Sequence, residues 1–310
     1  MTAFVVGVDG GGSKTIAIVA DEQGTVVAEA TGAASAINAS NVRASAEIIA
    51  SVVGEALAHA GDSDGETPRV LCVGVAGAGR ESLRVALRKA LAAHDLADEV
   101  VVYTDVAVAF DDAFERGPGI LVLAGTGSVA MGRGPTGTIE RCGGWGAVFG
   151  DEGSGAWIGR RALSIVAAAA DGREPETALS GAILTATESA EMSDLIAWAS
   201  DATPATLATL APAVMHVADA GDARANSLLD IASEELTLHA VALARTLFAD
   251  DRAALQIALG GGLLARGGGL RKRLVHRLKS AVPGAQVNHE DVVPARGAVR
   301  AALSELSKVG

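Results

Sequence analysis

The chain has 310 residues, of which 49% are hydrophobic and 20% are charged, a composition typical of a globular protein large enough for two domains. Only 3% of the residues are aromatic, so Ala, Val and Leu must build most of the interior. The formal net charge of −12 argues against a nucleic-acid partner, because phosphate backbones are bound by clustered Lys and Arg.

The sequence also argues against export, membrane insertion and several kinds of catalysis. No apolar run approaches the roughly 18 residues of a membrane span, and no export signal precedes the first apolar run. Two cysteines far apart, Cys72 and Cys142, indicate neither a disulfide framework nor a metal knuckle, so a cytoplasmic protein is expected. The six histidines are scattered without zinc-ligand spacing, and each is expected to be a surface or core residue.

The stretch from Val8 to Thr15, VDGGGSKT, is a glycine-rich loop that departs from both common nucleotide motifs. Ser13 separates Gly12 from Lys14, whereas a Walker A loop has its lysine directly after the last glycine. The dinucleotide fingerprint needs a third glycine where Thr15 stands. Because the flanking apolar runs read as strands, the loop is predicted to join two strands of a hairpin. It is either a phosphate-binding turn or a turn that only reverses the chain.

Strands and helices alternate along the next part of the chain, which predicts an α/β fold. A helix is predicted with Ser40 as its N-cap and Gly61 as its stop. The following predicted elements are a strand at 69–79, a helix at 80–94, a strand at 99–105 and a helix at 106–114.

The pattern restarts at Gly119, where residues 119–137 again give a strand, a glycine and threonine turn and a strand. This repeat suggests two related domains. Residues 152–251 are predicted to be largely helical, with breaks at Gly172, Pro204, Pro212 and Gly221. Residues 255–278 then return to a strand, a glycine turn and a helix, and a short strand and a last helix follow Pro283.

Three glycine turns follow predicted strands, at 10–12, 125–127 and 260–262. Glycine allows close approach to a ligand, and free amides at a turn favour anions. The first two turns carry hydroxyl groups suited to phosphate oxygens, whereas the third would suit the apolar face of an adenine ring. Each turn alone is weak evidence, and the three together favour a nucleotide site.

Several acids stand next to predicted helix starts. Asp105 either caps the helix that follows it or serves as the carboxylate that accepts a hydroxyl proton in phosphoryl transfer. Asp111 and Asp112 are expected to be solvated. In the segment 142–163, Asp151 and Glu152 either cap the next helix or bind a polyol, with Trp145 or Trp157 as an aromatic wall. The density of glycines favours binding.

These segments taken in order, GVDGGGSKT, TD, AGTGS, GGWGAVFGDEGSGAWIG and ALGGG, resemble the N-acetylglucosamine kinases within the BadF/BadG-type ATPase family of the actin, Hsp70 and sugar kinase superfamily. The match covers nearly the whole chain, and GGWG…GDEGSG is its specific part. The resemblance implies two actin-like, ribonuclease H-like domains, at 1–117 and 118–310, flanking a cleft for ATP, Mg²⁺ and sugar. The second domain would contain a helical insertion, and the last helix, about 294–306, could pack back on the first.

The resemblance also implies roles for single residues. The ATP phosphates would be bound by Gly11, Gly12, Ser13, Lys14, Thr15, Gly125, Thr126 and Gly127. Adenine would lie near Gly261 and Gly262, and Mg²⁺ near Asp9, through water. Asp105 would be the catalytic base, and the sugar would be bound by Asn38, Asp105, Thr126, Ser128, Gly144 and Asp151. Ala and Ser surround Asn38 where the family has Gly and Asn, which leaves the sugar open.

The resemblance therefore implies an ATP-dependent kinase that phosphorylates N-acetylglucosamine at O6, with glucosamine and N-acetylmuramic acid as alternative substrates. A homodimer is expected because dimers are common among relatives. A different class, an activator ATPase that drives an electron into a redox partner, would need cysteines near the second glycine loop, and Cys72 and Cys142 do not provide them. A sugar sensor without catalysis would be expected to lack Asp105.

Overall fold

The computed structural model describes residues 4–61, 67–115, 117–248 and 255–309. The chain divides into two compact units, the first formed by residues 1–116 and 292–310 and the second by residues 117–291. Each unit has one five-stranded mixed sheet, which confirms the predicted α/β class. Among the described residues, no helix is both long and apolar enough to cross a membrane.

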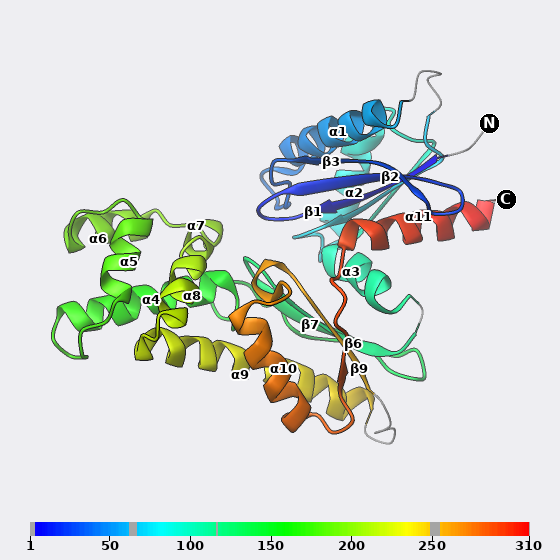
Figure 1. Cartoon of the computed structure of the whole chain (residues 1–310). Coiled ribbons are helices and arrows are strands. Elements are labelled where there is room, and N and C mark those ends of the chain that lie inside the picture. Colours follow the sequence, from blue (N-terminus) through cyan, green and yellow to red (C-terminus); the bar gives the residue numbers. More distant parts are fainter. Residues whose placement is uncertain (1–3, 62–66, 116, 249–254, 310) are drawn as a thin grey trace. The chain divides into compact units, whose positions relative to one another are not determined.

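Unit 1 alternates strands and helices as predicted, and its last helix comes from the C-terminal end of the chain (Figure 1). Its elements are β1 (Phe4–Gly10), β2 (Thr15–Asp21), β3 (Val26–Gly32), α1 (Val42–His59), β4 (Val70–Val75), α2 (Glu81–Ala92), β5 (Glu99–Thr104), α3 (Asp105–Phe114) and α11 (Pro294–Val309). The sheet has the order β3-β2-β1-β4-β5. The first three strands are antiparallel neighbours, and β4 and β5 continue the sheet in parallel with β1.

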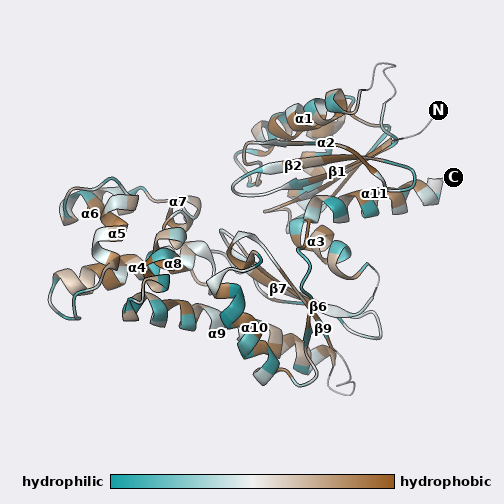
Figure 2. Ribbon diagram, viewed as in Figure 1, coloured by the Kyte–Doolittle hydropathy of each residue, from teal (hydrophilic) through white to brown (hydrophobic). Residues whose placement is uncertain are grey.

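Strand β1 lies in the middle of this sheet and is covered on both faces, which explains its continuous apolar sequence. Val6 and Val8 belong to the core under α1 and α2, whereas Val5, one residue out of phase, packs with α3 and α11. Helix α11 approaches β1 so closely that a Cβ on Gly7 would lie 2.3 Å from the backbone nitrogen of Val299. Figure 2 shows the strands of both sheets mostly in the brown of hydrophobic residues.

The structure corrects the predicted start of α1. Asn41, and not Ser40, is the N-cap residue, and its side-chain oxygen accepts a hydrogen bond of 2.7 Å from the backbone N–H of Asn38. The backbone N–H and the hydroxyl of Ser40 both donate to the side-chain oxygen of Asn38. The helix ends at His59, two residues before Gly61, which has a φ of 72°.

The prediction that Asp112 is solvated is wrong. Its side chain is only 1% exposed, and it forms an ion pair with Arg296 of α11, in which Nη2 of Arg296 lies 2.9 Å from Oδ2. The same carboxylate accepts a bond of 2.8 Å from the backbone N–H of Val293. Asp112 therefore fixes the start of α11 against α3, and its partner lies 184 residues away in the chain.

Unit 2 has an equivalent sheet followed by a large set of helices (Figure 1). Its elements are β6 (Gly119–Ala124), β7 (Ser128–Arg133), β8 (Ile139–Gly143), α4 (Gly155–Ala170), α5 (Leu179–Ala186), α6 (Met192–Ser200), α7 (Pro204–Ala208), α8 (Ala211–Asp219), α9 (Ala223–Leu247), β9 (Gln256–Gly260), the 3₁₀ turn η1 (Gly262–Leu264), α10 (Gly269–Ala281) and β10 (Gln286–Val287). Read from β8, the sheet order is β8-β7-β6-β9-β10, with β6 and β9 parallel.

The helical stretch of unit 2 has its breaks where glycine and proline predict them. Gly172 follows α4 with a φ of 69°, and Gly221 separates α8 from α9 with a φ of 97°. Pro204 and Pro212 lie in the first turns of α7 and α8, where a missing N–H removes no helical bond. The last residues of the stretch predicted to be helical, 249–251, lie outside the described residues.

Candidate functional site

The first glycine loop joins β1 to β2 as a tight turn, in which the backbone N–H of Gly11 donates to the carbonyl of Lys14 at 2.9 Å. Gly12, Ser13 and Lys14 are exposed, so their polar groups are open to a ligand. Thr15 is fully buried, and its hydroxyl donates to the carbonyl of Ala33 at 2.6 Å. The loop thus has an exposed tip, while Thr15 holds it to the segment that follows β3.

Asn38 lies at the end of that segment and is exposed. The residue before it, Ile37, is held to the end of β4, because its backbone N–H donates to the carbonyl of Ala76 at 2.9 Å. Gly77 makes this approach possible, since a Cβ there would lie 2.0 Å from the Ile37 carbonyl oxygen. The side-chain oxygen of Asn38 already accepts two bonds from Ser40, so a further bond from this side chain would come from its amide nitrogen.

Asp105 is the first residue of α3, but it does not cap the helix. Thr104 is the N-cap, and its hydroxyl oxygen accepts a bond of 3.2 Å from the backbone N–H of Ala107. Thr104 therefore fills the capping role that was the alternative for Asp105. This leaves the carboxylate of Asp105 as a candidate for the proton acceptor. Burial raises the pKa of Asp105, which is the direction that suits a general base operating near neutral pH.

Asp9 lies close to Asp105 at the carboxyl ends of the parallel strands. Asp9 of β1 is in register with Gly74 of β4, which is in register with Tyr103 of β5, two residues before Asp105. Burial first, and then the charge of Asp105, raise the pKa of Asp9 to about 6, while Lys14 acts in the opposite direction. Two buried acids that repel each other favour a cation between or beside them, so Asp9 fits Mg²⁺ binding.

The second glycine loop joins β6 to β7 and is tied to the start of α4. The carbonyls of Gly125 and Thr126 accept bonds from the backbone N–H groups of Gly155, at 2.8 Å, and Ala156, at 3.2 Å. Ser128, predicted to contact sugar, is only 3% exposed, and its hydroxyl donates to the carbonyl of Glu152 at 2.7 Å. The loop, α4 and the acidic segment before α4 therefore form one connected framework.

Asp151 and Glu152 do not cap α4, because Ser154 does. The Ser154 hydroxyl oxygen accepts a bond of 3.1 Å from the backbone N–H of Trp157. Asp151 has a φ of 54°, an uncommon conformation for a residue with a side chain. Its carboxylate lies against the second loop, since a Cβ on Gly127 would be only 2.9 Å from Oδ2.

The electrostatics of Asp151 are those of a partly buried acid in a backbone cradle. Burial raises its pKa, whereas hydrogen bonds from the backbone N–H groups of Gly146 and Ser128 act in the opposite direction. The Gly146 bond measures 3.3 Å. A carboxylate held by amides in a half-open glycine loop is suited to accept bonds from sugar hydroxyls.

Gly144 stands at the edge of this loop beside exposed apolar side chains. Its carbonyl accepts a bond of 3.0 Å from Nη1 of Arg141, whose guanidinium lies 4.8 Å from the centre of the Trp145 ring. Trp145 is 60% exposed, and Val148 and Phe149 are more exposed still. The aromatic wall predicted near the acids is therefore available at Trp145, whereas Trp157 is buried.

The third glycine turn follows β9. Gly261 has a φ of 89° and lies against the end of β6, where a Cβ would be 2.3 Å from the Ala124 carbonyl oxygen. Gly262 faces open space. Arg271 supports this turn from below, because its buried guanidinium donates to the carbonyls of Leu259 and Leu264. The run of basic residues 271–273 gives no sign of this role, which depends on contacts with β9 and the turn after it.

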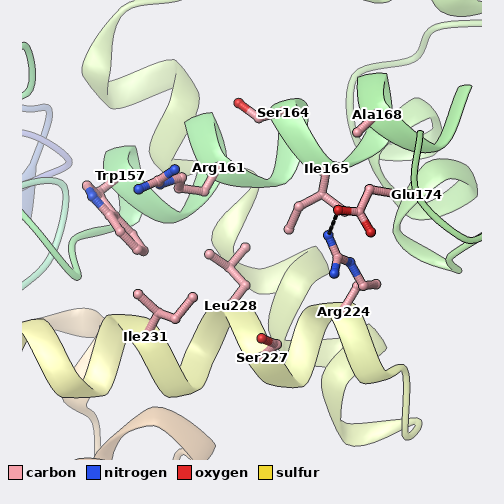
Figure 3. A pocket seen from close by; sticks show the side chains of 10 residues that line it. All are labelled: Trp157, Arg161, Ser164, Ile165, Ala168, Glu174, Arg224, Ser227, Leu228 and Ile231. Carbon is pink, nitrogen blue, oxygen red and sulfur yellow. Dashed lines mark ion pairs between the residues drawn. The ribbon is translucent and has the colours of Figure 1, made fainter. Parts of the chain in front are cut away.

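A pocket of about 330 Å³ lies between α4 and α9, away from the predicted ligand residues (Figure 3). Its lining comprises Trp157, Arg161, Ser164, Ile165, Ala168, Glu174, Arg224, Ser227, Leu228 and Ile231. Within it Arg224 pairs with Glu174 at 3.1 Å.

Among the described residues, no group of three His, Cys, Asp or Glu side chains is placed to hold a metal, so a Mg²⁺ ion at Asp9 would keep mostly water and phosphate ligands.

Two units with the same strand order, each with a glycine turn between its first two strands, define a protein of the actin-like fold. The BadF/BadG/BcrA/BcrD ATPase family matches residues 6–304, and the chain belongs to this family. This confirms the family indicated by the sequence motifs, and membership of an ATPase family implies the use of ATP.

Individual relatives agree with this assignment. The chain is 31% identical over 260 residues to the N-acetylmuramic acid/N-acetylglucosamine kinase of Clostridium acetobutylicum, covering 83% of this chain and 85% of that protein. It is 28% identical to the N-acetyl-D-glucosamine kinase of Dictyostelium discoideum, covering 96% and 97%. A solved structure from Chromobacterium violaceum, assigned provisionally as an N-acetylglucosamine kinase, matches with a TM-score of 0.80 and 30% identity, covering 96% and 98%.

Proposed function

We propose that the protein is an ATP-dependent amino-sugar kinase that transfers the γ-phosphoryl group to O6 of N-acetylglucosamine. The observation that carries the proposal is the carboxylate of Asp105, which is not the cap of α3. Thr104 caps α3 in its place, and burial raises the pKa of Asp105 in the same unit that presents an exposed glycine loop. A buried base near a phosphate loop is the arrangement that phosphoryl transfer to a hydroxyl requires.

In this mechanism Asp105 accepts the proton of the sugar hydroxyl as that oxygen attacks the γ-phosphorus. The exposed backbone of Gly12, Ser13 and Lys14 binds phosphate oxygens, and so do Gly125 to Gly127 in the second loop. Asp9 would hold Mg²⁺ through water, and the bound ion would supply positive charge to the phosphates. Thr15 and Ser128 position the loops instead of contacting ligands, because their hydroxyls are bonded to the protein itself.

The sugar is assigned to the groups that remain open. In unit 1, Asn38 offers its amide nitrogen. In unit 2, Asp151 offers its carboxylate and Gly144 its backbone, and the exposed Trp145 follows Gly144 in the chain. Gly261 and Gly262 are assigned to the adenine. Relatives named for N-acetylglucosamine and for N-acetylmuramic acid support an acetylated amino sugar as substrate, with N-acetylmuramic acid as the second candidate. We also propose that the protein forms a homodimer and is located in the cytoplasm. The free thiols of Cys72 and Cys142 support the cytoplasmic location.

The proposal is tested by ADP release with Mg²⁺ and ATP against N-acetylglucosamine, glucosamine, N-acetylmannosamine, N-acetylmuramic acid and glucose. We expect N-acetylglucosamine to stimulate turnover most, and the position of the phosphate to be O6 by NMR of the product. Asp105→Asn should abolish the stimulation, whereas Asp201→Asn, an exposed control with the same charge change, should not. A wild-type protein that binds ATP but responds to no sugar would contradict the proposal.

A further inference from the structure

His239 of α9 is a buried histidine that reaches the sugar-binding side of unit 2. The residue is only 8% exposed, and most of the neighbouring buried positions of α9, including Leu236, Ala240 and Leu243, are apolar, with Thr237 as a polar exception. Burying an imidazole among apolar side chains is unfavourable unless its nitrogens have partners. Packing alone therefore does not explain a histidine at position 239.

Two site segments meet at the His239 ring. Gly143 has a φ of 74°, and a Cβ there would lie 2.8 Å from Cε1 of the imidazole, so the backbone next to Gly144 rests directly on the ring. Nε2 of the same ring lies 3.7 Å from Oε2 of Glu152. His239 thus connects α9 to the turn before Gly144 and to the acid after Asp151.

Glu152 is held at its backbone but not at the end of its side chain. The Ser128 hydroxyl bonds its carbonyl at 2.7 Å, and Ser154 performs the capping of α4. Its side chain remains one-third exposed, with the carboxylate directed to the His239 ring. A carboxylate with a fixed backbone, an open side chain and an imidazole behind it is placed to bind a polar ligand.

We propose that Glu152 is a second sugar-binding carboxylate of unit 2 and that His239 is its positioning residue. The inference rests on the proposed function. Nε2 of the imidazole faces Glu152, while Nδ1 has no hydrogen-bond partner in the described part of the chain, and we therefore assign the proton of the neutral ring to Nε2. Burial lowers the pKa of His239, although the nearby acids Glu152, Glu235 and Asp151 act in the opposite direction. The ring is therefore neutral at pH 7 and has a single N–H donor for the carboxylate. The proposal requires that the 3.7 Å distance between Nε2 and Glu152 shorten when the sugar binds.

The test compares four variants by KM for N-acetylglucosamine, KM for ATP, and sugar Kd from tryptophan fluorescence without nucleotide. Glu152→Gln should raise the sugar KM and Kd about tenfold and leave the KM for ATP within about twofold, the loss expected for one charge-assisted hydrogen bond. Glu234→Gln, an exposed control on α9 with the same charge change, should alter neither. His239→Leu should match Glu152→Gln, and His239→Gln, whose amide nitrogen replaces Nε2, should stay within about threefold of wild type.

The outcomes separate this inference from the proposed function. If the wild type phosphorylates the sugar and Glu152→Gln behaves like Glu234→Gln, the inference is overturned while the proposed function stands. If His239→Leu and His239→Gln weaken sugar and ATP equally, His239 is only structural, and its positioning role is overturned. If no sugar stimulates or binds to the wild type, both fail. Should His239→Leu not fold, Glu152→Gln and His239→Gln still decide the question, because Glu152 is partly exposed and Gln keeps the donor.

Discussion

The two units build their sheets in the same order but place their acids differently. In unit 1, Asp9 and Asp105 stand at the ends of parallel strands, where burial raises the pKa of both. In unit 2 the candidate acid Asp151 lies in the glycine loop before α4. There it is partly exposed and accepts hydrogen bonds from backbone amides. The difference matches the roles that we propose, with proton transfer and metal binding in unit 1 and sugar binding at Asp151 in unit 2.

The two units share one structural feature: a hydroxyl residue, and not the acid, caps the helix that follows. In each, a hydroxyl residue caps the following helix in place of the acid, Thr104 directly before Asp105 in unit 1 and Ser154 three residues after Asp151 in unit 2. In each, the hydroxyl residue that begins the strand after the glycine turn, Thr15 of β2 or Ser128 of β7, donates to a backbone carbonyl. Hydroxyl groups therefore build the framework in both units, and carboxylates are left for chemistry.

The largest expected effect separates the roles of the two kinds of acid. Asp105→Asn should lower kcat about a thousandfold or more with little change in the sugar KM, because it removes the proton acceptor. Asp151→Asn should raise the sugar KM about tenfold and change kcat much less, because it weakens one binding contact. Steady-state kinetics with varied sugar at saturating ATP measures both. If Asp151→Asn carried the loss in kcat, the division of labour between the units would be reversed.

A second prediction concerns the glycine turns that bring these loops close to a strand. Gly261→Ala should destabilise unit 2 by about 3 kcal/mol, because a Cβ would meet the Ala124 carbonyl and the positive φ is strained for alanine. Gly262→Ala is the matched control, with open space around its Cβ, and should change stability by less than about 1 kcal/mol. Urea unfolding followed by circular dichroism gives both values, and equal effects would contradict the close packing of Gly261 on β6.

The sequence predicted those parts of the fold that local patterns determine. Strand periodicity and glycine turns predicted both hairpins, and Gly172 and Gly221 marked the ends of helices, because these signals need no distant partner. The capping residues were present as signals too, since Thr104 and Ser154 are hydroxyl residues directly before a helix. Reading them would have left Asp105 and Asp151 without a structural role.

Long-range contacts account for what the sequence did not predict. Asp112 looks like a surface acid until α11, far along the chain, supplies Arg296. Arg271 lies in a run of basic residues, yet its guanidinium is buried among backbone carbonyls. His239 is one of several scattered histidines until α9 packs it under Gly143. In each case the partner is set by packing of elements distant in sequence, which periodicity cannot reveal.

A third prediction tests the burial of Asp9 in unit 1. Its pKa is raised from an ordinary value near 4 to about 6, so folding favours the protonated form. The resulting stability is present below pH 4 and is lost as the pH rises through 6. Asp9→Asn should therefore be more stable than wild type by about 2 kcal/mol at pH 8 in EDTA and show little difference at pH 4.

The control for this experiment is Asp98→Asn, which makes the same charge change on the surface of unit 1. Thermal unfolding of the two variants and the wild type at both pH values gives the comparison. A gain in Asp98→Asn equal to that in Asp9→Asn would mean that net charge, and not burial beside Asp105, is responsible.

The smallest expected effect has the opposite sign and belongs to unit 2. Burial lowers the pKa of His239, so the unfolded chain binds a proton more readily than the folded one, and stability is lost as the pH falls below 6.5. His239→Gln cannot titrate, and its melting temperature should fall less than that of the wild type between pH 7.5 and about 5.5. The exposed His94→Gln should follow the wild type. If the melting temperature of His239→Gln fell as much as that of the wild type, the acids around the ring would offset the effect of its burial. The opposite pH dependence predicted for the two units would then not hold.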